Sequence, residues 1–146
     1  MVGALVVTHG KVARELVNAA YRIIGENRSL IAVCIDWDED VASARRKIET
    51  AIAAVETGNG VVILTDMFGG TASNLSLALL DPGRIEVVTG VNLSMLLKLG
   101  NTASANLSLA EMAEALCGRG RESIQIPSRT LGTRPAGAGT GREGNR

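Results

Sequence analysis

Aromatic residues are nearly absent from this 146-residue chain, at 2% of the composition, whereas hydrophobic residues make up 46%. A core with so few aromatic rings has to be packed from Val, Ile, Leu and Ala, a mixture typical of buried parallel strands covered by helices. A chain of this length buries enough apolar surface to fold without disulfides or metal ions. The composition therefore favours a single α/β domain.

Neither sign of charge is in excess, because 15 Lys and Arg residues balance 15 Asp and Glu residues. Such a balance does not draw the whole protein toward nucleic acid or an anionic membrane. No apolar run approaches the roughly 18 residues of a transmembrane helix, and the opening run from Met1 to Val7 lacks the basic flank of a signal peptide. We therefore expect a cytoplasmic protein with no nucleic-acid partner and no membrane insertion.

Cysteine and histidine are also scarce, with two Cys residues and one His. Cys34 and Cys117 have neither the CxxC nor the Cys/His spacing of a zinc site, so we expect buried, reduced thiols. One histidine cannot build a multi-histidine metal site, and neither a Walker lysine loop nor a GxGxxG motif occurs. The sequence predicts that the protein uses no metal and no cofactor.

What is present is an alternation of strand and helix patterns. Short continuous apolar runs predict strands, and apolar residues at helical spacing predict helices. The predicted strands cover residues 2–7, 29–35, 61–65 and 84–89, and the predicted helices cover 11–24, 41–55 and 71–80, with two more beginning near Asn92 and at Ser108. With right-handed connections, this order gives a doubly wound, mostly parallel four-stranded sheet with helices on both faces.

Local details of three helices can also be predicted. In the first helix the apolar residues at helical spacing are Val12, Leu16, Ala19, Ala20, Ile23 and Ile24. Thr71 is the predicted N-cap of the third helix, and Ser108 with Glu111 forms a capping box for the last.

The chain changes character near its C-terminus. Ser123 to Ile126 is predicted to be a last strand. From Pro127 onward Arg, Gly, Thr and Ala dominate, in a pattern that cannot bury a face. We expect a domain over residues 1–126 and a flexible Gly/Arg-rich tail over residues 127–146.

His9 comes directly after the first predicted strand, in the segment Thr8-His9-Gly10. In doubly wound sheets, ligands and chemistry collect beyond the carboxyl ends of the strands. Neutral imidazole is a nucleophile that titrates near physiological pH, so it can accept and release a phosphoryl group. The alternative is a loop histidine without a chemical role.

Asp66 follows the third predicted strand as His9 follows the first. Its carboxylate can accept a hydrogen bond from one imidazole nitrogen and leave the other free to attack phosphorus. In the loop that follows, Gly69 and Gly70 let backbone amides approach a phosphoryl group at a helix N-terminus, and Thr71 adds a hydroxyl donor. The alternatives are a carboxylate that caps local amides and a glycine pair that makes a tight turn.

Two further features concern the surface. Phe68 is the sole phenylalanine and is a candidate contact for a partner protein if it lies at the tip of its loop, although burial under the loop is an equal alternative. Arg45, Arg46 and Lys47 form a charge run on the polar side of the second helix, which we interpret as a solvated face.

Three segments together carry a family resemblance: Thr8-His9-Gly10, residues 66–74 and residues 89–96. In this order and spacing they resemble the IIA domain of the mannose family of the phosphoenolpyruvate-dependent sugar phosphotransferase system, over roughly residues 1 to 126. One departure is Ala72, at a position where members of the family usually carry proline. That change removes a preset helical φ but no chemical group.

The resemblance implies a phosphotransferase without a cofactor, in which His9 is the phosphorylated residue and Asp66 orients it. It implies that phosphate arrives from the histidine-containing phosphocarrier protein (HPr) and passes to a IIB component for carbohydrate uptake. It also implies a homodimer in which the strand from Ser123 to Ile126 crosses to the partner's sheet. Three alternatives remain: a regulatory phosphorylation sensor, a phosphoryl donor for dihydroxyacetone kinase, and a flavodoxin-like domain that binds a small ligand.

Overall fold

Four parallel strands form the centre of the molecule in the computed structural model, which describes residues 1–102 and 105–132. The strand order is β2-β1-β3-β4. The strands are β1 (Gly3–His9), β2 (Leu30–Ile35), β3 (Val61–Thr65) and β4 (Ile85–Thr89), and the helices are α1 (Val12–Ile24), α2 (Val41–Val55), α3 (Thr71–Ala78), α4 (Leu93–Thr102), α5 (Leu109–Glu122) and α6 (Pro127–Thr130). The predicted parallel α/β sheet is therefore confirmed.

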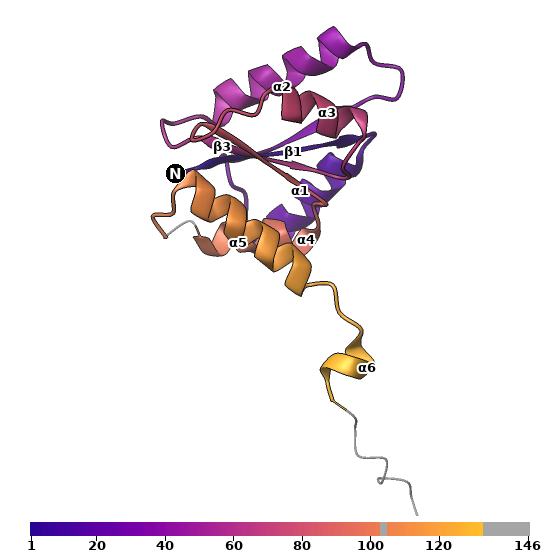
Figure 1. Ribbon diagram of the computed structural model, residues 1–146, viewed down its shortest axis with the longest axis vertical. Helices are drawn as coiled ribbons and strands as arrows, with labels where there is room; N and C mark the ends of the chain where they lie inside the picture. The colour runs from indigo at the N-terminus through magenta and orange to yellow at the C-terminus, as the bar shows by residue number, and fades with distance from the viewer. Residues whose placement is uncertain (103–104, 133–146) are drawn as a thin grey trace, which may run out of the picture.

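Two helical layers enclose this sheet, with α2 and α3 on one face and α1, α4 and α5 on the other (Figure 1). In β1, Leu5 and Val7 point toward the first layer, whereas Ala4 and Val6 point toward the second. Successive side chains of a strand point to opposite faces, so a strand covered on both faces must be apolar at every position. This explains the continuous apolar runs in the sequence.

The order of the strands positions the functional edge of the sheet. β1 and β3 pair directly, although α1, β2 and α2 lie between them in the chain. The chain leaves β1 into α1 on one face and leaves β3 into α3 on the other, so the two connections diverge (Figure 1). Such a switch point opens a crevice at the carboxyl ends of the two strands, where His9 ends β1 and Asp66 follows β3.

The residues of α1 that are buried are only partly those that the apolar spacing in the sequence indicates. Ala13, Val17 and Ala20 are buried, whereas Val12 is 49% exposed and Ile23 is 60% exposed. Two alanines among the buried residues let the helix lie close to the sheet. Because α1 carries apolar residues on more than one side, periodicity alone did not identify the buried side.

The N-caps of α4 and α5 agree better with the expectation from the sequence. Asn92 Oδ1 accepts a hydrogen bond from the Met95 amide at 3.1 Å at the start of α4. The predicted capping box of α5 is confirmed, because Ser108 and Glu111 exchange side-chain to backbone hydrogen bonds of 2.8 and 3.2 Å. These bonds satisfy amides that lack an acceptor in the first turn of a helix.

The segment from Ser123 to Ile126 does not form the predicted strand within the described chain. Ser123 is the C-cap of α5, and Ile124 and Ile126 are 80% and 53% exposed. A strand needs a hydrogen-bonded neighbour, which this segment does not find in its own sheet. Pro127 then begins α6, so the predicted flexible tail opens with a helical turn, while residues 133–146 lie outside the described residues. Among the described helices, none has the length and apolar character needed to cross a bilayer.

Candidate functional site

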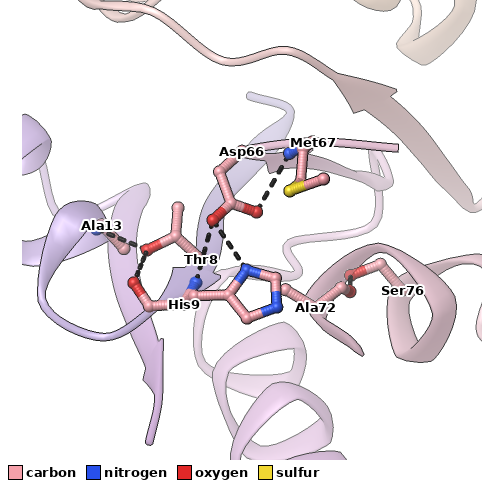
Figure 2. Close-up of polar contacts among 7 residues, drawn as sticks. All are labelled: Thr8, His9, Ala13, Asp66, Met67, Ala72 and Ser76. Carbon is pink, nitrogen blue, oxygen red and sulfur yellow. Dashed lines mark hydrogen bonds and ion pairs between the residues drawn. The ribbon is translucent and has the colours of Figure 1, made fainter. Parts of the chain in front are cut away.

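His9 and Asp66 contact each other at the carboxyl ends of β1 and β3 (Figure 2). Asp66 Oδ2 lies 2.9 Å from His9 Nδ1 and also accepts a hydrogen bond from the His9 backbone amide at 3.1 Å. The other carboxylate oxygen accepts a hydrogen bond from the Met67 amide at 3.0 Å. The fold thus brings together two predicted site residues that are 57 positions apart, and it holds both oxygens of the carboxylate.

The contact determines which imidazole nitrogen is available for chemistry. An ionised carboxylate only accepts hydrogen bonds, so the proton of the neutral ring lies on Nδ1 and Nε2 keeps its lone pair. The side chains of His9 and Asp66 are 17% and 21% exposed. The pair is therefore sheltered but reachable from the sheet edge.

The charge of Asp66 results from two opposing effects. Burial raises the pKa of this carboxyl group, but hydrogen bonds from the His9 ring, the His9 amide and the Met67 amide outweigh burial. The net pKa lies below its ordinary value of 3.8. Asp66 is accordingly ionised at neutral pH, which makes it a fixed negative charge beside Nδ1.

Thr8 holds the turn that leads from β1 into α1. Its buried hydroxyl oxygen accepts a hydrogen bond from the Ala13 amide at 2.6 Å, and the hydroxyl donates to the His9 carbonyl at 3.3 Å (Figure 2). Gly10 turns the chain with a φ of 54°. Thr8 thereby ties the backbone of His9 to the start of α1, so the imidazole extends from a rigid support.

The Gly69-Gly70-Thr71 loop approaches the imidazole from the side of α3. Gly70 is the N-cap of α3 with φ −84° and ψ 171°, so the prediction that Thr71 is the cap is wrong, and Thr71 begins the helix with its side chain exposed. A Cβ on Gly70 would lie 2.5 Å from His9 Cε1 and 3.1 Å from Nε2. Glycine is therefore required here because a side chain would collide with the His9 ring, and not because of the backbone conformation. Gly69 instead has a φ of 89°, which favours glycine for the turn itself.

Helix α3 forms without the proline that the family resemblance leads one to expect. Ala72 lies in its first turn and is fully buried. The Ser76 hydroxyl donates a hydrogen bond to the Ala72 carbonyl at 2.7 Å (Figure 2). The N-terminus of α3 thus reaches the site with an alanine in place of proline.

An aromatic contact that the sequence interpretation missed covers the ring of His9. The ring centroids of Trp37 and His9 lie 5.3 Å apart and the ring planes differ by 18°. Trp37 belongs to the turn after β2, and β2 is the other neighbour of β1. Because parallel strands end at one edge, the sole tryptophan, two residues after the end of a strand, was a usable signal.

The remaining candidates lie around or outside this contact. Phe68 is 73% exposed, as expected for a loop tip, and Met67 beside it is 57% exposed. Arg45 pairs with Glu49 at 2.9 Å on the outer side of α2, in keeping with a solvated face.

The two cysteines that were predicted to be buried, Cys34 and Cys117, are free thiols and are only half-buried. Within residues 1–102 and 105–132, no three His, Cys, Asp or Glu side chains gather closely enough to hold a metal ion.

Comparison with known proteins places the chain in a family. Residues 3–117 match the EIIA-man family, described as the PTS system fructose IIA component. The PTS system fructose-specific EIIA component of Bacillus subtilis is 27% identical over 132 residues, which are 90% of this chain and 90% of that protein. The PTS system mannose-specific EIIAB component of Escherichia coli is 28% identical over 119 residues, which are 81% of this chain but only 37% of that longer protein.

A solved structure shows the same fold. The phosphotransferase system component EIIA from Streptococcus agalactiae superposes with a TM-score of 0.79 at 21% identity. The superposition covers 88% of this chain and 99% of that one. The architecture around the site is therefore shared at low sequence identity.

The lowered pKa of Asp66 predicts an acid-dependent contribution to stability. A carboxyl group whose pKa is lower in the folded than in the unfolded chain stabilises the fold above its ordinary pKa of 3.8, and this contribution disappears as the pH falls through the folded value. Asp66→Asn should reduce the free energy of unfolding by about 1 kcal/mol at about pH 5, and the deficit should shrink below about pH 4.

Chemical denaturation of both proteins across this pH range measures the effect. Asp38→Asn is the control, because it neutralises an exposed carboxylate in the turn after β2. A deficit for Asp66→Asn that is the same at all pH values would contradict the assignment of an ionised Asp66.

Proposed function

The chain belongs to the EIIA-man family, and from this membership we propose that it is a phosphoryl carrier of the sugar phosphotransferase system whose acceptor atom is Nε2 of His9. The observation that carries the proposal is the hydrogen bond between His9 Nδ1 and Asp66 Oδ2. It leaves the Nε2 lone pair free beside the N-terminus of α3. A nucleophile next to backbone donors suits phosphoryl transfer, which depends mainly on positioning and charge stabilisation.

Loading of the carrier is proposed to begin with in-line attack of Nε2 on the phosphorus of phosphorylated HPr. A bond forms between Nε2 and phosphorus, the bond from phosphorus to the donor imidazole breaks, and the donor nitrogen takes the electron pair. The His9 ring gains positive charge while its proton stays on Nδ1. Asp66 stabilises that charge through the 2.9 Å contact, so it acts both on orientation and on the energy of the product.

The phosphoryl oxygens are proposed to bind the segment from Gly69 to Thr71. Amides in the first turn of a helix have no acceptor within the helix and point toward bound anions. Gly70 lies against the Nε2 side of the ring, so a phosphoryl group on Nε2 would meet this terminus. The Thr71 hydroxyl is exposed and is a further donor.

Transfer of the phosphoryl group from His9 Nε2 to a IIB component in the cytoplasm is proposed to occur at the same site. A phosphohistidine that is to be passed on must be kept from water while the acceptor is docked. Met67 and Phe68 present exposed apolar side chains in the loop that begins at Asp66. We propose that both HPr and IIB cover these side chains, which would exclude water from the transfer path.

The proposed assembly is a homodimer in which residues 123–126 of each chain pair with the partner's β4. β4 is an edge strand of the described sheet. A groove of about 510 Å³ runs beside it and is lined in part by Val88, Met95 and Ile124. An open strand edge beside an exposed apolar segment supports strand exchange, because the backbone groups of the partner's segment could form hydrogen bonds with those of the edge strand.

His9→Ala is predicted to abolish loading, because it removes the only imidazole in the chain. The measurement is transfer of labelled phosphate from phosphoenolpyruvate through enzyme I and HPr. Circular dichroism and the thermal midpoint serve as the control for folding. Undiminished label on the variant would refute the proposal.

Gly70→Ala is predicted to slow loading by about 100-fold, because its Cβ would push the His9 ring away from the transfer geometry. The backbone at Gly70 lies in a region open to alanine, so the fold should survive. Gly118→Ala is the matched control, since its Cβ would meet no atom of the described chain within 4 Å apart from its chain neighbours and the nearby backbone of its own helix. Equal loading rates for both variants would show that the approach of Gly70 to His9 is unimportant.

Ile124→Asp combined with Ile126→Asp is predicted to convert the dimer into monomers, because charged side chains cannot enter the β4 groove without a desolvation cost. Light scattering coupled to size exclusion gives the molar mass. Leu131→Asp is the control, as it alters an exposed apolar residue beyond the proposed strand. A double variant that remains dimeric would place the interface elsewhere.

A further inference from the structure

We propose that Trp37 is a positioning residue for phosphoryl transfer, which holds the His9 imidazole in the orientation that directs Nε2 toward the incoming phosphorus. This inference rests on the proposed function, because it concerns the atom that would accept phosphate. It adds a residue from a third loop, after β2, to a site otherwise built from the ends of β1 and β3 and the start of α3.

The geometry shows a specific contact rather than incidental proximity. The indole and the imidazole are stacked within 18° of parallel, with centroids 5.3 Å apart. The indole also lies over Gly10, where a Cβ would stand 3.4 Å from Trp37 Nε1. The indole therefore lies in van der Waals range of the residue next to His9, and the positive φ of Gly10, 54°, turns the chain from β1 toward α1.

Burial does not explain the placement of Trp37, which is 80% exposed. Leaving a side chain of this size in water forgoes most of its hydrophobic stabilisation. The contacts that we identify for the indole are with His9 and Gly10. The contacts of Trp37 therefore stabilise the position of the His9 ring rather than the hydrophobic core.

The turn that carries Trp37 is braced on α2. Glu39 accepts a hydrogen bond from the Asp36 amide at 3.1 Å and forms an ion pair with Lys47 at 2.9 Å. Asp40 caps α2 through the Ser43 amide at 2.8 Å. These contacts flank Trp37 on both sides in sequence, so the indole is presented from a supported turn.

Stacking supplies a restraint that the other contacts lack. The torsion that rotates a histidine ring is broad, and one hydrogen bond at Nδ1 leaves the ring free to tilt about that bond. Gly70 limits movement at the Cε1 and Nε2 edge, and Trp37 limits movement perpendicular to the plane. An aromatic face also attracts a cation, so the stack favours the positively charged ring of the phosphorylated state.

The stack is tested first on the unphosphorylated protein by proton NMR. His9 is the only histidine, so its two carbon-bound ring protons give one assignable pair of signals. The indole ring current should shift these signals, Trp37→Ala should abolish the shift, and Trp37→Phe should keep much of it. Identical His9 signals in wild type and Trp37→Ala would overturn the proposal, whether or not the protein accepts phosphate.

The second measurement is the rate of loading from phosphorylated HPr as a function of HPr concentration. Trp37→Ala should lower the maximal rate about 10-fold, Trp37→Phe should restore most of it, and Leu131→Ala, which truncates another highly exposed apolar residue, should match wild type. A change in KM alone would assign Trp37 to partner docking and overturn the positioning role. If wild type itself accepts no phosphate, the carrier function fails, while the NMR result still decides whether Trp37 holds the ring.

Discussion

The hydrogen bond between His9 Nδ1 and Asp66 Oδ2 is the interaction on which the site depends. It selects the tautomer, frees Nε2 and places a negative charge beside the ring. The same carboxylate oxygen accepts a hydrogen bond from the His9 backbone amide, so Asp66 binds the end of β1 as well as the side chain. Because Asp66 directly follows β3, this bond requires β1 and β3 to be neighbours in the sheet.

Adjacent strands with diverging connections also explain why the rest of the site forms. α1 leaves toward one face and α3 toward the other (Figure 1), and α/β sheets bind their ligands at such diverging connections. Gly70 brings the N-terminus of α3 against the Nε2 side, and Trp37 approaches from the turn after β2. Three strand ends and one helix end thus define the orientation of a single imidazole.

Elements with strong local signals could be predicted from the sequence. Strand β3 has the predicted bounds, and α5 begins with the predicted capping box, because each depends on residues close together in the chain. Features that depend on contacts with residues distant in the chain were harder to predict. The buried side of α1 is decided by the sheet beneath it, and the N-cap of α3 at Gly70 rather than Thr71 is decided by how the loop meets His9. The predicted strand at residues 123–126 depends on an edge that its own sheet does not offer.

The class of fold could be inferred from the sequence alone, because apolar periodicity is local, and the single histidine and Asp66 could be selected as candidate site residues because each follows a recognisable strand. Only the tertiary structure decided which imidazole nitrogen is free, how close Gly70 comes to it, and that Trp37 covers the ring. The physical reason is that these are distances between groups on different strands and loops. Such distances depend on strand order and turn geometry, which hydrophobic periodicity does not encode.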